Sequence, residues 1–216
     1  MNLIASTGSR SLTATQRNAV HVSTMSGKLA GIPAINTNTL SNPFCVTMSQ
    51  AHKGIICSSC YSVSMLSTFR KMCVPAFERN SETLSHGIIE DWQIPRFNTV
   101  YARFSGHGEI INETHAINLF RIAQANPHTT FGWWTKRKDV IRKAMRVVGE
   151  KPANVILVYS NAHIDKPMSK PPAGFDKVFN NVSDSYEGEI NCTGKCMDCL
   201  ACYRHGTTSV IVERVK

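Results

Sequence analysis

Eight cysteines are the residues of this 216-residue sequence whose type and spacing point most directly to chemistry. The denser group is Cys192-Thr-Gly-Lys-Cys196-Met-Asp-Cys199-Leu-Ala-Cys202, whose last three cysteines follow C-x2-C-x2-C. This compact run lets one short loop supply several thiolates to an iron–sulfur cluster, whereas zinc usually takes two CxxC pairs from separate loops. The spacing therefore favours a [4Fe–4S] cluster over zinc at this group.

A second, looser group lies in the first half of the chain. Cys57-Ser-Ser-Cys60 brings two sulfurs to one centre, and Cys45, eleven residues earlier, is positioned to fold back as a third ligand. Cys73 stands alone and is expected to pack as a small apolar residue. The two groups either hold separate clusters or share one, and a single zinc bound by Cys57, Cys60 and a C-terminal CxxC pair is also geometrically sound.

Composition restricts the environment and the partners. No apolar run approaches the roughly 20 residues of a membrane span, and the sequence start lacks a signal-peptide pattern. We therefore expect a cytoplasmic protein whose thiols are reduced, not one with four disulfides. The net charge of +9 would suit nucleic acid, but metal-bound thiolates would lower it, and the basic residues from Lys136 to Arg146 have the spacing of a solvated helix face.

From Thr99 onward, short apolar segments alternate with amphipathic ones, which predicts parallel βαβ units. Strands are expected at 99–104, 129–135, 154–160, 177–182 and 208–215, and helices at 112–125 and 138–148. A helix over 61–80 is expected to be broken or ended at Pro75. The sequence thus predicts one α/β domain over residues 1–216, built as a partial (β/α) barrel or an open parallel sheet with cysteine-rich loops. Residues 1–40 are expected to form an irregular arm with one short strand, and 190–204 the cysteine-rich cluster loop.

Polar residues and glycines follow the expected strands, at the carboxyl ends where such folds place their sites. The first strand runs into Ser105-Gly106-His107-Gly108-Glu109. Glu109 is expected either to contact a ligand or to cap the helix that begins at Asn112, and His107 is expected to be solvated. Lys136 and Asn161 are candidates by their positions at strand ends.

Trp133 and Trp134 are adjacent near the end of an expected strand. Because neighbouring strand residues face opposite sides, one is expected in the core while the other is free to line a pocket. Core packing is the first expectation for both.

The order of these elements is similar to that of the radical S-adenosylmethionine superfamily, in which a three-cysteine loop ending in Cys-x-x-Cys-Tyr precedes a Gly-Gly-Glu-like motif. Here Cys57-Ser-Ser-Cys60-Tyr61 and Arg103-Phe104-Ser105-Gly106-His107-Gly108-Glu109 carry the resemblance. It implies that Cys45, Cys57 and Cys60 ligate a [4Fe–4S] cluster with an open iron. It also implies that Gly106, Gly108 and Glu109 contact S-adenosylmethionine, and that the C-terminal cysteines hold an auxiliary cluster.

The whole chain also resembles an uncharacterised family of phage-encoded iron–sulfur proteins, which would place it in the host cytoplasm. The leading expectation is a [4Fe–4S] protein of redox or radical chemistry, with an electron donor protein and a small-molecule ligand as partners and no membrane or nucleic acid. Because Cys45 and Cys57 are eleven residues apart, whereas the superfamily spaces its cysteines as C-x3-C-x2-C, an electron carrier or structural cluster protein without S-adenosylmethionine is the alternative. A zinc-stabilised nucleic-acid-binding module is the second alternative.

Overall fold

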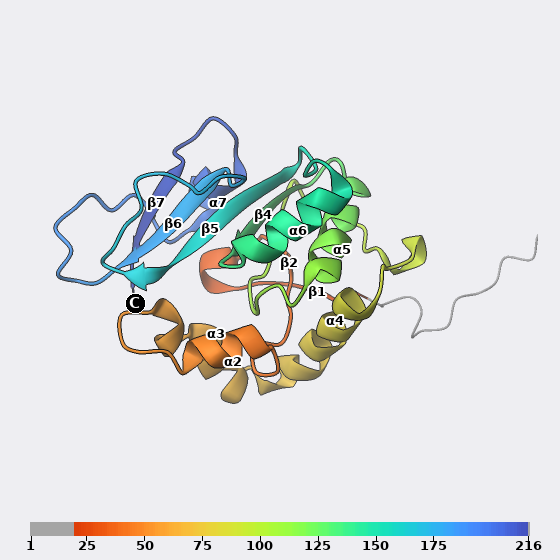
Figure 1. The fold of residues 1–216 in the computed structure, drawn as a ribbon, viewed down its shortest axis with the longest axis horizontal. Helices are drawn as coiled ribbons and strands as arrows, with labels where there is room; N and C mark the ends of the chain where they lie inside the picture. Colours follow the sequence, from red (N-terminus) through yellow and green to blue (C-terminus); the bar gives the residue numbers. More distant parts are fainter. Residues whose placement is uncertain (1–19, 216) are drawn as a thin grey trace, which may run out of the picture.

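The structure, a computed structural model, describes residues 20–215. Its centre is a seven-stranded sheet in which the strands lie in chain order (Figure 1). The strands are β1 (Val22–Ser23), β2 (Ala34–Ile35), β3 (Tyr101–Phe104), β4 (Thr130–Thr135), β5 (Val155–Ile164), β6 (Lys177–Val182) and β7 (Val210–Arg214). Strands β2 to β7 are parallel and β1 is antiparallel to β2. The predicted α/β class with an open, mostly parallel sheet is confirmed.

One face of the sheet is covered by α5 (Glu113–Gln124) and α6 (Lys138–Val148), which follow β3 and β4 in the chain (Figure 1). The core beneath them is aromatic: Phe104 stacks on Phe131 with ring centroids 4.5 Å apart, and Trp133 meets Phe104 edge-on. Helix α6 buries Val140 and other apolar residues while its basic side chains Lys138, Arg142, Lys143 and Arg146 are exposed. These four residues form the solvated helix face that the spacing predicts, whereas Lys136 and Arg137 of the same basic segment precede the helix and are partly buried.

The opposite face carries a second core. Trp134 and Phe179 pack there with Leu200 and Tyr203, which belong to the segment of α7 (Cys196–Cys199) and η5 (Ala201–Tyr203). A Cβ at Gly132 would lie 2.7 Å from the Tyr203 ring, so the glycine lets this ring rest on β4. Trp133 and Trp134 thus face opposite sides of β4, as the period of two requires.

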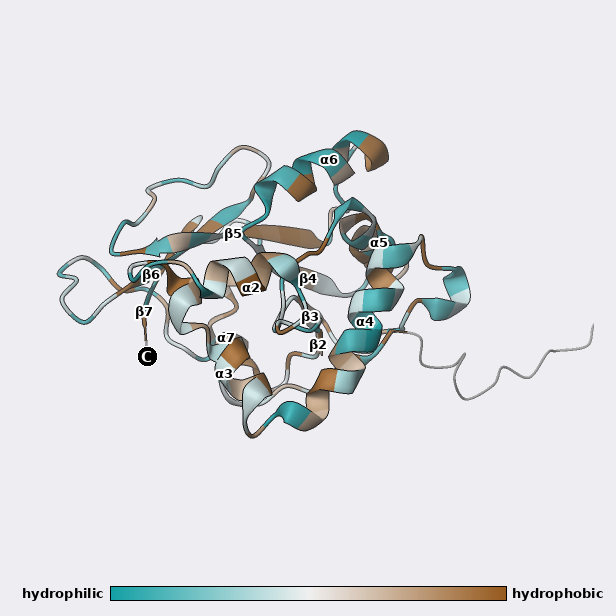
Figure 2. Ribbon diagram, turned by 60° about the horizontal axis from the view of Figure 1, so that its bottom comes forward, coloured by the Kyte–Doolittle hydropathy of each residue, from teal (hydrophilic) through white to brown (hydrophobic). Residues whose placement is uncertain are grey.

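A helical layer lies near the carboxyl ends of the strands (Figure 1). It consists of α2 (Pro43–Ser49), η2 (Ile56–Ser59), α3 (Tyr61–Ser67) and η3 (Lys71–Cys73), and it continues into α4 (Val74–His86) and η4 (Asp91–Gln93). Ile55 bridges to His163 near the end of β5, and the Ile164 amide donates to the Gly54 carbonyl at 2.9 Å. In Figure 2, β5 changes from hydrophobic to hydrophilic along its length, so the end of the strand that faces the helical layer is the polar one.

The structure differs from the sequence expectations in the first half of the chain. Residues 20–40 contribute two short strands and η1 (Gly27–Leu29), where an irregular arm with one strand was expected; residues 1–19 of that arm lie outside the described part. Pro75 lies in the first turn of α4 and so begins a helix, because the first turn needs no proline N–H. No helix within residues 20–215 is long and apolar enough to cross a membrane.

Candidate metal centre

A cavity of about 510 Å³ lies at the carboxyl ends of the strands. Its walls contain every cysteine expected to bind metal, from both halves of the sequence: Cys45, Cys57, Cys60, Cys192, Cys196, Cys199 and Cys202. The residues expected to contact a cofactor, Gly106, Gly108 and Glu109, line the same cavity. Cys73, which is expected to have no role in metal binding, does not line it.

The N-terminal cysteines lie on three short helical elements. Cys45 is in α2, Cys57 is in η2, and Cys60 is the residue that precedes α3. Burial raises the pKa of Cys45 to about 12, and the nearby Glu109, Cys60 and Cys57 add to this effect. Cys45 therefore lies within electrostatic reach of the other two thiols, and burial favours the protonated form of both Cys45 and Cys57.

Sequence reasoning missed the helix that positions Cys45. The Asn42 side chain accepts hydrogen bonds from the backbone amides of Phe44 and Cys45, at 3.0 and 3.4 Å, and Pro43 occupies the first turn. Asparagine followed by proline is a recognised helix-start signal, so these two residues could have revealed α2.

The turn after β3, residues 105–109, packs tightly against the segment that follows β2. Ser105 and Gly108 have positive φ angles of 58° and 76°. A Cβ at Gly106 would lie 2.7 Å from Asn36 Oδ1, and one at Gly108 would lie 2.6 Å from the Thr37 carbonyl oxygen. Both glycines are thus required by packing within the protein itself.

His107 is buried at 2% exposure, so the expectation of a solvated turn histidine is wrong. Its Nδ1 lies 2.7 Å from Ser62 Oγ, and its ring packs between Tyr61 and Phe77. Burial lowers the pKa of His107 to about 4, with Arg70 and Arg103 contributing. The imidazole is therefore neutral at physiological pH and joins the turn to α3.

Glu109 connects the β3 turn to the end of β4. Its carboxylate accepts from the backbone amides of Ile110 at 2.9 Å and Lys136 at 2.8 Å, and its side chain lines the cavity. The expectation that it caps the helix at Asn112 is wrong, because the Asn112 side chain itself accepts from the His115 amide. Of the two expected roles, contact with a ligand remains a prediction.

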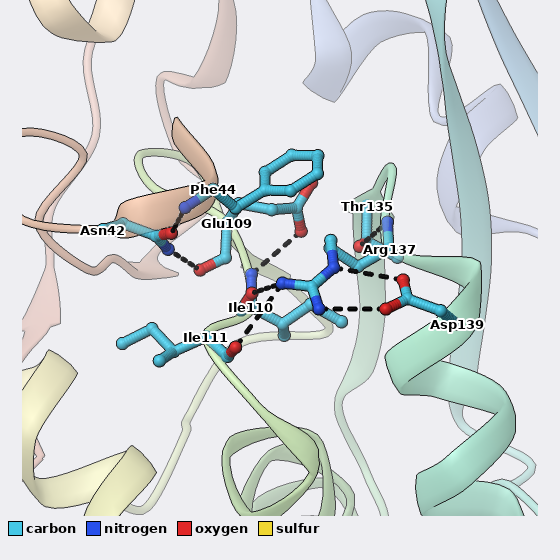
Figure 3. A network of polar contacts seen from close by, with 8 residues as sticks. All are labelled: Asn42, Phe44, Glu109, Ile110, Ile111, Thr135, Arg137 and Asp139. Carbon is cyan, nitrogen blue, oxygen red and sulfur yellow. Dashed lines mark hydrogen bonds and ion pairs between the residues drawn. The ribbon is translucent and has the colours of Figure 1, made fainter. Parts of the chain in front are cut away.

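Figure 3 shows how the residues around Glu109 are held. Asn42 donates from its side chain to the Glu109 carbonyl at 2.7 Å. On the other side, Arg137 reaches the carbonyls of Ile110 and Ile111 and pairs with Asp139 at 2.9 Å. The helix bearing Cys45, the Glu109 turn and the start of α6 are therefore coupled.

The C-terminal cysteines are fixed against β7 and the second core. The amides of Asn191 and Cys192 both donate to the Val212 carbonyl, and the Asn191 side chain accepts from the Val212 amide at 2.8 Å. Cys192, Cys196 and Cys202 pack against the core of Trp134, Leu200 and Tyr203. Burial raises the pKa of Cys202 to about 12.

Cations line the cavity wall, and two of them, Lys28 and Arg103, were not predicted. Lys28 pairs with Glu213 at 2.5 Å, and Arg103 lies over the Trp134 ring. Lys136, a candidate from its strand-end position, lines the cavity and donates to Ser160 Oγ at 3.0 Å. Asn161 lies outside the wall and instead bonds the Lys166 carbonyl and the Asn180 side chain. Nothing in the local sequence distinguishes Lys28 or Arg103 from surface cations.

All eight cysteines are free of disulfides, so thiols are available as ligands. Within residues 20–215, no three His, Cys, Asp or Glu side chains converge closely enough to hold a metal ion. Binding would therefore require the thiols of a group to turn toward a common point. In donor type and number the cavity suits a thiolate-ligated group.

The fold and the cavity together define an α/β protein with a cysteine-lined site at the carboxyl edge of a parallel sheet. The model of the family described as Gene product 88 (GP88) matches residues 3–206, and the chain belongs to this family. Neither the curated proteins nor the solved structures gave a match. The resemblance to the radical S-adenosylmethionine superfamily stays a prediction.

Proposed function

We propose that this protein binds [4Fe–4S] clusters through the cysteines of the cavity and uses them in redox chemistry. The observation that carries the proposal is the segregation of the cysteines: the seven with ligand-like spacing line one cavity, and the isolated Cys73 does not. Random burial of small apolar residues would not sort them in this way. When bound, such clusters supply one-electron transfer.

The charged neighbours of the thiols support two centres. The charges that act on Cys45 include those of Cys57 and Cys60, whereas Cys202 is influenced by Cys192 and Cys196. Cys45 and Cys202 thus each interact with thiols of their own sequence group, and Cys199 joins the second group by its spacing. We assign Cys45, Cys57 and Cys60 to one centre, and Cys192, Cys196, Cys199 and Cys202 to the other.

Zinc is the less favoured occupant. A zinc–sulfur bond of about 2.3 Å in a tetrahedron requires sulfurs about 3.8 Å apart. The described thiols surround a cavity and do not converge on a point. A cluster core is several atoms wide and fills more of such a cavity than one ion does, which supports a cluster as the occupant.

A radical-type function, in which S-adenosylmethionine binds beside the three-cysteine centre, has one supporting observation. The Tyr61 hydroxyl donates to the Gly106 carbonyl, so the residue after Cys60 is tied directly to the glycine turn. An electron carrier without S-adenosylmethionine is favoured by the close fit of Gly106 and Gly108 against Asn36 and Thr37. In that case, the glycines are needed for folding alone.

Iron and acid-labile sulfide analysis of anaerobically prepared protein tests the cluster, with absorbance near about 400 nm as a second readout. We expect iron and sulfide in the wild type and in Cys73→Ser. With two centres, Cys57→Ser and Cys199→Ser should each lose about half of the iron, since an oxygen ligand replaces a thiolate poorly. With one shared centre, either change should remove nearly all of it.

Stoichiometric zinc without sulfide would contradict the proposal. Loss of iron in Cys73→Ser equal to that in Cys57→Ser would contradict the ligand assignment, because Cys73 lies outside the cavity wall.

A further inference from the structure

Arg103 is a cation in the cavity wall without a charged partner. It lies on β3, and its guanidinium carbon is 3.8 Å from the centroid of the Trp134 ring. Its Nε is buried and has no hydrogen-bond acceptor, and within residues 20–215 no carboxylate forms an ion pair with it. Lys28, in the same wall, is paired with Glu213.

The surroundings of Arg103 are the C-terminal thiols. Trp134, on which the guanidinium lies, belongs to the core cluster against which Cys192, Cys196 and Cys202 pack. Although burial raises the pKa of Cys196 and Cys202, the Arg103 charge opposes this effect in both, more strongly than any other charge. The cation and these thiols therefore occupy one side of the cavity.

A sheltered cation without a counter-charge is costly, because it has lost hydration and gained only the weaker attraction of the Trp134 ring in return. Metal binding converts nearby thiols into thiolates, which would supply that counter-charge. The buried Tyr203 hydroxyl lies beside the Arg103 guanidinium, whose charge opposes the rise that burial causes in the pKa of Tyr203, but it too is left without a well-formed hydrogen bond. Both groups are thus suited to a negatively charged centre beside them.

We propose that Arg103 compensates the negative charge of the C-terminal centre and raises its reduction potential. This inference rests on the proposed function. Reduction adds one electron from a donor to the cluster and makes it more negative, so a fixed cation favours the reduced form. Arg103 keeps its proton throughout, since a guanidinium does not titrate in proteins. Arg103 acts through its positive charge and is not a ligand of the cluster.

The test is a potentiometric titration with dithionite and mediator dyes, followed by electron paramagnetic resonance. A Cys57→Ser background removes the N-terminal centre, so the signal reports only the C-terminal one. Arg103→Met keeps an apolar stem on Trp134 and removes the charge. We expect the reduction equilibrium to shift about tenfold toward the oxidised form, which is about 59 mV for a one-electron couple. Arg103→Lys keeps the positive charge, so its reduction potential should stay close to that of the wild type.

Arg204→Met is the matched control. Arg204 also lies over an aromatic ring, that of Tyr101, and is two residues from Cys202, but it is exposed and outside the cavity wall. Water and salt screen its charge, so the potential should stay within a small fraction of the Arg103→Met shift.

Iron and sulfide contents are measured first in every variant. Full cluster content in Arg103→Met with an unchanged potential would overturn the inference and leave the proposed function intact. Absence of a cluster from the wild type would remove both. If Arg103→Met loses the cluster and Arg103→Lys retains it, the charge is needed to hold the centre, which supports the inference; loss in both would show a packing role and overturn it.

Discussion

Buried His115 should make the stability of the fold depend on pH. The residue lies in α5 at 1% exposure, and its Nδ1 accepts from the Ile111 amide at 3.2 Å. Burial lowers the pKa of His115 from 6.5 to about 3. Between these values the unfolded chain binds a proton that the folded chain rejects, so stability falls as the pH drops below about 6.5. Above that pH the histidine is neutral in both states and contributes no pH dependence.

The size of the effect follows from the two pKa values. Each pKa unit corresponds to about 1.4 kcal/mol, so at pH 5.0, about 1.5 units below the unfolded value, His115 should cost about 2 kcal/mol of unfolding free energy. His107, whose pKa is lowered to about 4, should add a similar amount. The wild type is therefore expected to lose about 4 kcal/mol from the two histidines together.

Urea unfolding at pH 7.5 and pH 5.0 measures this loss. His115→Asn keeps an acceptor near the Ile111 amide and removes the titrating group, so its loss between the two pH values should be about 2 kcal/mol smaller than that of the wild type. His128→Asn is the control, because His128 is exposed. Equal pH dependence in wild type and His115→Asn would refute the reasoning from burial, even if the variant is less stable at both pH values.

Three further outcomes are expected. Gly108→Ala should cost at least about 2 kcal/mol in urea unfolding, because φ is positive and the new Cβ meets Thr37; Gly149→Ala, with positive φ but open space, should cost only about 1. Asn42→Ala should lose about 1 kcal/mol of helix capping and release iron faster to a chelator than wild type does, whereas unchanged release would show that α2 is held by other contacts. Adding S-adenosylmethionine to reduced protein should leave its paramagnetic resonance spectrum unchanged; a changed spectrum that Glu109→Ala abolishes would establish the radical-type function.

Much of the fold was predictable because its strands and helices are strongly patterned. The nearly continuous apolar run of β5 and the apolar stripe of α6 each specify their element locally. Helix α6 has the expected bounds, and β5 begins within one residue of the expected start but extends four residues further, to Ile164. The short strands β1 and β2 carry two residues each and have no such pattern. β2 forms because the longer β3 supplies hydrogen-bond partners, and β1 pairs with β2 in turn, so both depend on information outside their own sequence.

In the candidate site, too, some features could be predicted from local sequence and others depend on distant residues. The seven cysteines whose spacing predicts metal binding all line the cavity, and the binding itself stays a prediction. The burial of His107 was not predictable, because it depends on Ser62 and Phe77, which lie far from it in sequence. Arg103 was overlooked for a similar reason: its significance comes from Trp134 on the next strand and from thiols near the end of the chain.

The meeting of the two cysteine groups follows from curvature of the sheet. Strands laid out in chain order place β1 and β2 at one edge and β7 at the other, which in a flat sheet would keep their neighbours far apart. Yet Lys28, between β1 and β2, pairs with Glu213 on β7, and Gly31 approaches Met197 of α7. The sheet must therefore curl so that its two edges approach each other without pairing. The cavity lies on the inside of that curve, where the N-terminal and C-terminal thiols reach it from opposite ends of the chain.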